Sequence, residues 1–253
     1  MSLAAAFTRD DGRTNVPDVD SCWDDWVAAS RTMNFCCEDP LLDWLNAHGE
    51  TRGFVRDSPP RDDGLSTDFR EFIFRKALEF EASVVAELSR RYRARTICGA
   101  SGESRDRARV EATWEAMRDG TEIIVQGTLW NAETQTYGAP DLLVRCDVLH
   151  RIFPDSVSEA HARQGAPDLA SSDRHYRVVD VKFTTLDLLK DGHAGSGHLK
   201  HMVQIWLYNE ALGRMQGFTP GGRIPAGPSL ETVKGARRFG ARSAWADRSR
   251  SDI

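Results

Sequence analysis

HYRVVDVKFTT, residues 175–185, has the pattern of a β-strand with one apolar and one charged face. Successive side chains of a strand point to opposite faces, so Val179 and Val181 share one face and Asp180 and Lys182 share the other. The apolar face is suited to packing on a helix. The stretch therefore predicts a core strand that carries a carboxylate and an ammonium group side by side.

Lys182 is an informative residue because the chain contains 28 arginines and only 5 lysines. A generic surface cation in this chain would be arginine. A lysine beside an aspartate on an apolar strand suggests a compact ammonium that holds a water or offsets developing negative charge. An ordinary ion pair at the edge of a strand is the alternative.

The tetrapeptide GAPD occurs twice upstream of this strand, at residues 138–141 and 165–168. After the first copy, apolar and polar residues alternate, which predicts a strand lining a cleft. After the second copy, the residues LASSD show no strand period. Pairing in a sheet, and not distance along the chain, decides which carboxylates meet. We therefore predict that Asp141 belongs to the site and that Asp168 lies on a loop.

The neighbouring segments complete an α/β pattern. Helix, strand, strand, strand, helix is the order expected of a domain built on a central sheet. The polar segment from Pro154 to Arg174 interrupts this order as an inserted loop. The predicted elements are a helix from Thr67 or Asp68 to about Arg93, two hairpin strands within 121–130 and 139–153, the strand at 175–185, and a helix from about His198 to Met215.

Glu81 lies on the same side of the first helix as its apolar stripe. A carboxylate on a core-facing stripe is costly unless a partner pairs with it. From helical position alone, Glu81 is either a paired functional group or a residue at the edge of the stripe with its carboxylate in water.

Composition limits the class of protein. With 253 residues and 40% hydrophobic content, the chain can form one sizeable core. We expect an acidic N-terminal appendage at 1–66, partly disordered and then helical, a core at 67–219, and a basic irregular tail at 220–253. The appendage has 13 acidic residues, 6 arginines and no lysine, and its helix starts at Asp39 and Pro40. It is a candidate surface for a protein partner.

Charge and hydropathy exclude several roles. A net charge of −5 argues against nonspecific coating of nucleic acid. Seven arginines between residues 90 and 109 form either a local basic patch or a solvated helix end. No apolar run approaches the roughly 18 residues of a membrane span, and the N-terminus lacks a secretion signal. We expect a cytoplasmic protein with no membrane partner.

Two aspartates and a glutamate that converge at one end of a sheet offer hard oxygen ligands. Mg²⁺ and Mn²⁺ prefer such ligands, keep several waters and share their coordination with substrate phosphate. A metal bound in this way polarises a phosphate and lowers the pKa of a bound water. The pattern favours metal-dependent phosphodiester chemistry.

Four segments support this reading together: FEASVVAEL, GAPDLLVR, VVDVKFTT and QIWLY, in this order over about residues 70–219. They resemble the motifs of the PD-(D/E)XK nuclease superfamily, and the last is similar to the Gln-x-x-x-Tyr motif of its RecB-like branch. The resemblance implies a restriction-endonuclease-like core, with a central mixed sheet flanked by helices, that cleaves DNA with Mg²⁺ or Mn²⁺ as an exonuclease or endonuclease. It implies Asp141, Asp180, Glu81 and Val181 at the metal, Lys182 in water activation, and Gln204 and Tyr208 in support of the site or in contact with nucleic acid.

The chain also departs from this family. Some RecB-like relatives hold an iron–sulfur cluster with three cysteines near the C-terminus, but here no cysteine follows Cys146, so we expect no cluster. Some relatives have a histidine where Glu81 stands. His193, His198 and His201 could suggest a second metal site, although histidines at a Gly-rich turn are commonly solvated.

Two other function classes compete with a nuclease. A catalytically silent module could keep the fold and bind nucleic acid or a partner protein, which the acidic composition and the unusual C-terminal segment favour. A small-molecule phosphohydrolase would need a Gly-rich phosphate loop between a strand and a helix, and no such loop is evident in the sequence.

Overall fold

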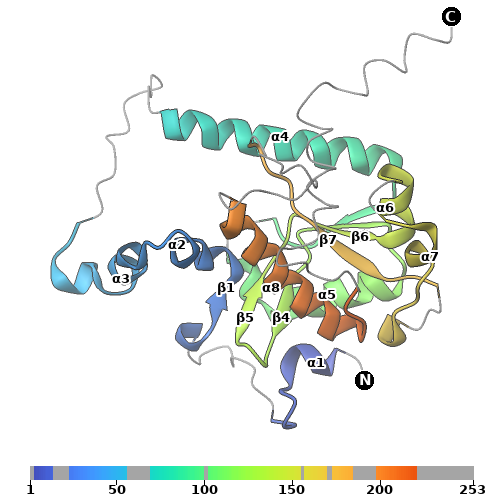
Figure 1. The fold of residues 1–253 in the computed structure, drawn as a ribbon, viewed down its shortest axis with the longest axis horizontal. Coiled ribbons are helices and arrows are strands. Elements are labelled where there is room, and N and C mark those ends of the chain that lie inside the picture. Colours follow the sequence, from blue (N-terminus) through green and yellow to red (C-terminus); the bar gives the residue numbers. More distant parts are fainter. Residues whose placement is uncertain are drawn as a thin grey trace, which may run out of the picture.

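The computed structural model describes residues 3–13, 23–55, 69–99, 102–154, 157–169, 173–184 and 198–220 (Figure 1). Within these ranges the chain is an α/β protein with two mixed sheets flanked by helices, which confirms the predicted class. In the same ranges, every helix is too short or too polar to cross a membrane. The helices are α1 (Ala4–Phe7), α2 (Met33–Cys36), α3 (Pro40–His48), α4 (Phe69–Arg91), α5 (Arg107–Arg118), α6 (Cys146–Ile152), α7 (Glu159–Ala162) and α8 (Leu199–Gln216).

A four-stranded mixed sheet lies between α4 and α8. Its strand order is β2-β3-β6-β7, where β2 is parallel to β3, and β6 is antiparallel to both of its neighbours. The predicted single central sheet is therefore only part of the architecture, because a second sheet has the order β1-β5-β4. The strands are β1 (Val27–Ala28), β2 (Ala94–Thr96), β3 (Ile123–Val125), β4 (Leu129–Asn131), β5 (Thr136–Gly138), β6 (Leu142–Arg145) and β7 (Tyr176–Val179).

Alternate residues of the four-stranded sheet enter two separate cores. Ile124, Leu143 and Val178 are in register and point to the core that contains α5 and α8. Leu142 and Val144 point to the opposite face, where α4 and α6 pack. In Figure 1, α4 runs above β6 and β7, and α5 and α8 lie below them. The result is a helix–sheet–helix arrangement, in which a strand is apolar on both faces.

Aromatic side chains join the smaller sheet to the N-terminal segment. Trp130 of β4 is 1% exposed and packs against Phe7, Trp23 and Trp26, with ring centroids 5.2 to 5.9 Å apart. Strand β1 pairs in parallel with β5. Part of residues 1–66, predicted as an appendage, thus contributes to the larger core.

Helix α3 forms where the sequence predicts it, beginning after Asp39 and ending at Gly49. Its apolar residues are not packed in the core, since Leu41, Leu42 and Trp44 are exposed. Residues 221–253 of the predicted basic tail lie outside the described residues, as do His193 and the turn around it.

The predicted strand within 121–130 is broken at Gln126 and Gly127. Gln126 has a φ of 48°, and the chain leaves the four-stranded sheet there and enters the smaller sheet as β4. A Cβ at Gly127 would lie 2.8 Å from the Leu143 Cδ1 atom, so a larger residue would have to displace this packed side chain.

The predicted strand within 139–153 also ends early. β6 stops at Arg145, and Cys146–Ile152 form α6. Val148 and Leu149 are consecutive and both buried, which fits a helical period and not the period of two expected of a half-buried strand. The spacing of apolar residues over 142–148 is compatible with both the strand period of two and the helical period. The strands β1, β2 and β5 and the helix α5 were not predicted from the sequence.

The C-terminal end of α8 is fixed to the edge of β7 by one side chain. The Gln216 Oε1 atom accepts a hydrogen bond from the Tyr176 backbone N–H at 2.9 Å, and Gln216 Nε2 donates to the Tyr176 carbonyl oxygen at 3.2 Å. The amide therefore pairs with β7 as a neighbouring strand would. This attachment fixes the position of α8 relative to the residues that follow β7.

His175, directly before β7, is fully buried. We expect its burial to make the fold less stable in acid. Its Nδ1 atom lies 2.7 Å from the Gln164 carbonyl oxygen and must donate, while Nε2 is buried with no partner in the described part of the chain. Burial lowers the pKa of His175 to about 4, opposed by the bond to Gln164. Because the unfolded chain binds the proton more readily, stability is full above about pH 6.5 and is lost as the pH falls toward 4.

We expect protonation of His175 to lower the free energy of unfolding by roughly 3 kcal/mol between pH 7 and pH 4. The measurement is urea unfolding of the wild type and of His175→Asn, whose amide can still donate to Gln164. The variant should have a lower stability at pH 7 and a shallower loss on acidification. Parallel pH profiles for the two proteins would contradict the prediction.

Candidate metal-dependent active site

The register of the four-stranded sheet places three polar residues in a row at one end. Val125 pairs with Leu142, and Leu142 pairs with Val179, both in antiparallel register. One step further along, Gln126 lies opposite Asp141, and Asp141 lies opposite Asp180. The Gln126 backbone N–H donates to the Asp141 carbonyl oxygen at 3.0 Å, which continues the pairing beyond β3.

Asp180 and Lys182 form a largely buried ion pair. Lys182 Nζ donates to Asp180 Oδ1 at 2.9 Å and lies 2.9 Å from Oδ2. The Asp180 side chain is only 2% exposed, and its Oδ2 atom accepts no hydrogen bond of good geometry from the described residues. Burial lowers the pKa of Lys182, but Asp180 and Asp141 outweigh it and leave the pKa above its ordinary value. Lys182 is therefore a cation in this site.

Asp141 is held by the backbone that follows β7. The Val181 N–H donates to Asp141 Oδ2 at 2.6 Å. Burial, followed by repulsion from Asp180, raises the pKa of Asp141 to about 8, and Glu81 adds to the repulsion while Lys182 opposes it. A buried carboxyl group whose charge is disfavoured by a neighbouring carboxylate is suited to binding a cation.

Glu81 reaches the same place from α4. Its Oε1 atom accepts a hydrogen bond from Gln126 Nε2 at 3.3 Å, and its charge acts on both Asp141 and Lys182. Glu81 is thus half-buried and paired with Gln126. Gln126 is a site residue that the sequence analysis missed; the signal was its position opposite the first GAPD aspartate, which becomes visible only once the strands are in register.

Gln204 and Tyr208 of α8 border the site from the other side of the sheet. Gln204 Nε2 donates to the Tyr208 hydroxyl at 3.2 Å, and both residues are buried. Burial raises the pKa of Tyr208 to about 12, in part opposed by the bond to Gln204, with the charges of Asp180 and Asp141 also acting to raise it. A Cβ at Gly138 would lie 2.7 Å from the Tyr208 ring, so the glycine of the first GAPD copy makes room for this tyrosine.

His201 corrects the expectation of solvated histidines. Its Nδ1 atom is buried without a hydrogen-bond partner in the described part of the chain, and its ring stacks on that of His198 at 6.4 Å. Burial, followed by repulsion from Lys182, lowers the pKa of His201 to about 4, while Asp180 opposes the shift. His201 is therefore a neutral residue near the ion pair at neutral pH.

The residues at this end of the sheet suit a hard divalent cation. Apart from the Lys182 ammonium 2.9 Å away, the buried Asp180 Oδ2 atom has no hydrogen-bond partner among the described residues, and Asp141 has a neighbouring like charge that a cation would neutralise. Among the described residues, no three His, Cys, Asp or Glu side chains are grouped tightly enough to enclose a metal on their own. Mg²⁺ does not require such a cage, because it keeps several waters and uses one or two carboxylates together with substrate phosphate.

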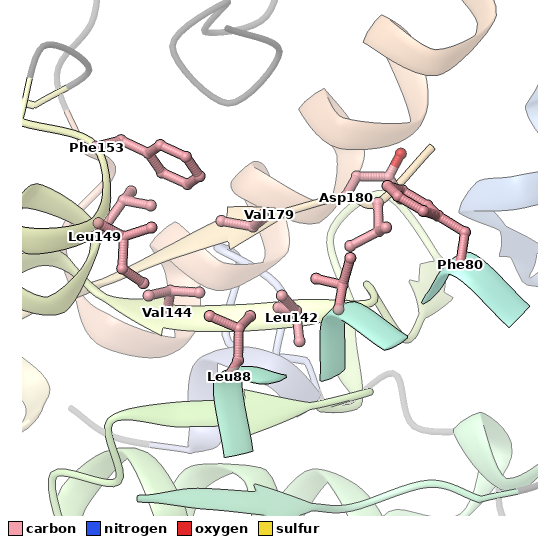
Figure 2. A pocket seen from close by; sticks show the side chains of 11 residues that line it. Phe80, Leu88, Leu142, Val144, Leu149, Phe153, Val179 and Asp180 are labelled. Atoms are coloured by element: carbon pink, nitrogen blue, oxygen red, sulfur yellow. The ribbon is translucent and has the colours of Figure 1, made fainter. Parts of the chain in front are cut away.

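An apolar hollow adjoins the site between α4 and the sheet. It opens to solvent and is lined by side chains of α4, β6, β7 and α6. Figure 2 shows Asp180 and Phe80 at one end and Leu149 and Phe153 at the other. The carboxylate of Asp180 therefore lies where the apolar helix–sheet contact gives way to the polar site.

Two features named in the sequence lie away from this site. Asp168 of the second GAPD copy is next to Gly217 at the C-terminal end of α8, where an added Cβ would lie 2.6 Å from its carboxylate. The clustered arginines are largely engaged: Arg90 and Arg91 pair with Glu87, and others bond to Tyr137, Glu111 or backbone oxygens. These contacts favour a solvated helix end for that segment over a free basic patch.

Comparisons of the whole chain with known protein families, curated proteins and solved structures find no match. The chemistry of the site is accordingly inferred from the residues that meet at the end of the sheet. These residues come from three separate segments of the chain, with Glu81 in α4, Asp141 before β6, and Asp180 and Lys182 after β7.

Proposed function

We propose that the protein is a metal-dependent nuclease that hydrolyses phosphodiester bonds of DNA, built on a restriction-endonuclease-like core. The observation that carries the proposal is the convergence of Asp141, the Asp180–Lys182 ion pair and Glu81 at one end of the sheet. The resemblance of four sequence segments to RecB-like nucleases supports DNA as the substrate. A protein partner for the exposed apolar residues of α3 belongs to the same proposal.

Asp141 and Asp180 would hold Mg²⁺ or Mn²⁺, with Glu81 and the Val181 backbone beside them. The metal supplies Lewis-acid chemistry, because it polarises the phosphate and lowers the pKa of a bound water. No iron–sulfur cluster is part of the proposal.

In the hydrolysis, a water oxygen forms a bond to phosphorus, the bond from phosphorus to one deoxyribose oxygen breaks, and a proton ends on that oxygen. Lys182 is charged and would stabilise the negative charge that develops on the phosphoryl oxygens. The high pKa of Tyr208 keeps it a neutral phenol, which suits a hydrogen-bonding role and not a nucleophilic one. Gln204 holds its hydroxyl in place.

The test is a cleavage assay on linear double-stranded, circular and single-stranded DNA with Mg²⁺, Mn²⁺ or EDTA. We expect cleavage that needs the metal and is lost in Asp180→Ala and Lys182→Ala proteins that melt as cooperatively as the wild type. The loss should be at least about 10²-fold, the scale of removing one transition-state contact. Digestion of linear but not circular DNA would identify an exonuclease.

Two results would reject the proposal. Equal activity of the wild type and both variants would show that the chemistry lies elsewhere or comes from a contaminant. The absence of cleavage by a folded, metal-supplied wild type would favour the catalytically silent module, and binding of the same DNA molecules would then test that alternative.

A further inference from the structure

Gln126 is a polar residue of the site to which the proposed reaction assigns no role. It has a φ of 48°, which places a non-glycine residue in the left-handed region. Such a conformation costs about 1 to 3 kcal/mol and persists only where the surrounding structure imposes it, often at functional sites. We therefore expect contacts of Gln126 that stabilise this strained backbone conformation.

Gln126 makes two hydrogen bonds in this backbone conformation. Its backbone N–H donates to the Asp141 carbonyl oxygen at 3.0 Å, and its side-chain amide donates to Glu81 Oε1 at 3.3 Å. The amide nitrogen faces the carboxylate because a carboxylate only accepts. One residue therefore joins the strand end that bears Asp141 to the carboxylate that comes from α4.

The rest of the contact between α4 and this part of the sheet is apolar and open. Phe80, Val84 and Leu88 of α4 face this hollow (Figure 2). Apolar contacts are non-directional and do not fix a carboxylate at one point. The hydrogen bond from Gln126 to Glu81, at the end of the hollow, is directional and can fix the carboxylate.

We propose that Gln126 is a positioning residue that holds the Glu81 carboxylate toward Asp141 and Asp180, and thereby sets the affinity of the site for a divalent cation. The inference rests on the proposed function of this site. Residues that orient metal-binding carboxylates typically change metal affinity or activity by about 10- to 100-fold when they are replaced.

The experiment measures Mn²⁺ binding by isothermal titration of the full chain without DNA. Gln126→Gly removes the amide and adopts the left-handed backbone without strain, so the fold is kept. Gln126→Asn also tolerates this backbone, but its amide is one methylene shorter and falls short of Glu81. We expect both variants to bind Mn²⁺ about 10-fold more weakly than the wild type.

A double variant separates positioning from a direct effect. On a Glu81→Gln background, Gln126→Gly should cause no further loss of Mn²⁺ affinity, because the residue through which it acts is already altered. In the cleavage assay, the Gln126 variants should regain wild-type rates when the Mn²⁺ concentration is raised by about the same 10-fold factor.

The outcomes distinguish this inference from the proposed function. Wild-type Mn²⁺ affinity in both Gln126 variants, or additive losses in the double variant, would overturn the positioning role while a cleaving wild type leaves the nuclease proposal intact. A folded wild type that neither binds Mn²⁺ nor cleaves DNA would overturn both.

Discussion

Asp141→Asn is expected to lower metal-dependent DNA cleavage by about 10³-fold while the metal-free protein becomes more stable. Asparagine can still accept the hydrogen bond from the Val181 N–H, but it carries no charge to hold a cation. It also removes one of two carboxylates whose mutual repulsion in a buried position is costly. A gain of about 1 to 2 kcal/mol is the usual scale when a functional site gives up such a group.

The measurements are initial cleavage rates and thermal melting at pH 8, with and without Mg²⁺. For a chain of this size, each kcal/mol corresponds to a shift of about 2 to 4 °C. Mg²⁺ should raise the melting temperature of the wild type, because it binds the native state, and should have little effect on the variant.

The two GAPD copies provide a matched control. Asp168→Asn makes the same chemical change in the same tetrapeptide, but Asp168 lies beside Gly217 at the end of α8. It should keep wild-type cleavage and the Mg²⁺-dependent melting shift. Equal loss of cleavage in both variants would contradict the assignment of Asp141 to the site.

Trp130→Ala is expected to destabilise the fold by about 3 to 5 kcal/mol, as for other fully buried tryptophans. Trp130 packs edge-on against Phe7 and Trp23, and its Nε1 atom donates to the Ser104 carbonyl oxygen at 2.8 Å. Truncation leaves a cavity and an unpaired carbonyl between the smaller sheet and the N-terminal segment. The loss should appear as a lower urea midpoint by circular dichroism.

Trp44→Ala is the control for this change, since Trp44 lies on α3 and is 42% exposed. We expect it to alter stability by less than about 1 kcal/mol. Similar losses in both variants would show that Trp130 does not join the N-terminal segment to the core. A large loss only in Trp130→Ala would show that the packing of Trp130 against Phe7, Trp23 and Trp26 stabilises the fold.

Much of the candidate site follows from local patterns. The period of two after the first GAPD copy and around Asp180 was enough to predict two strands and to place Asp141, and not Asp168, beside them. The extent of those strands was not predictable, because residues 142–148 fit both a strand and a helix period and because glycine at position 127 serves a packing contact with Leu143.

The places of Gln126 and His201 in the site could not be predicted from local sequence patterns. Gln126 does not stand out by residue type, and His201 gave no sign of burial beside Lys182. Each joins the site through partners 15 or more residues away, Glu81 and Asp141 for Gln126 and Lys182 for His201. Side-chain burial and pairing across strands depend on the whole fold, so no short window of sequence contains them.

The sequence by itself determined the α/β class, the α4, α3 and α8 helices, and the identity of the groups that carry charge, because helical and strand periods and the choice of Lys182 are local properties. The tertiary structure alone decided that Gln126, Asp141 and Asp180 stand in one row, that α4 brings Glu81 to it, and that the N-terminal aromatic residues enter the core. The physical reason is that register and burial arise from long-range packing, which adds energy only when distant segments are already in contact.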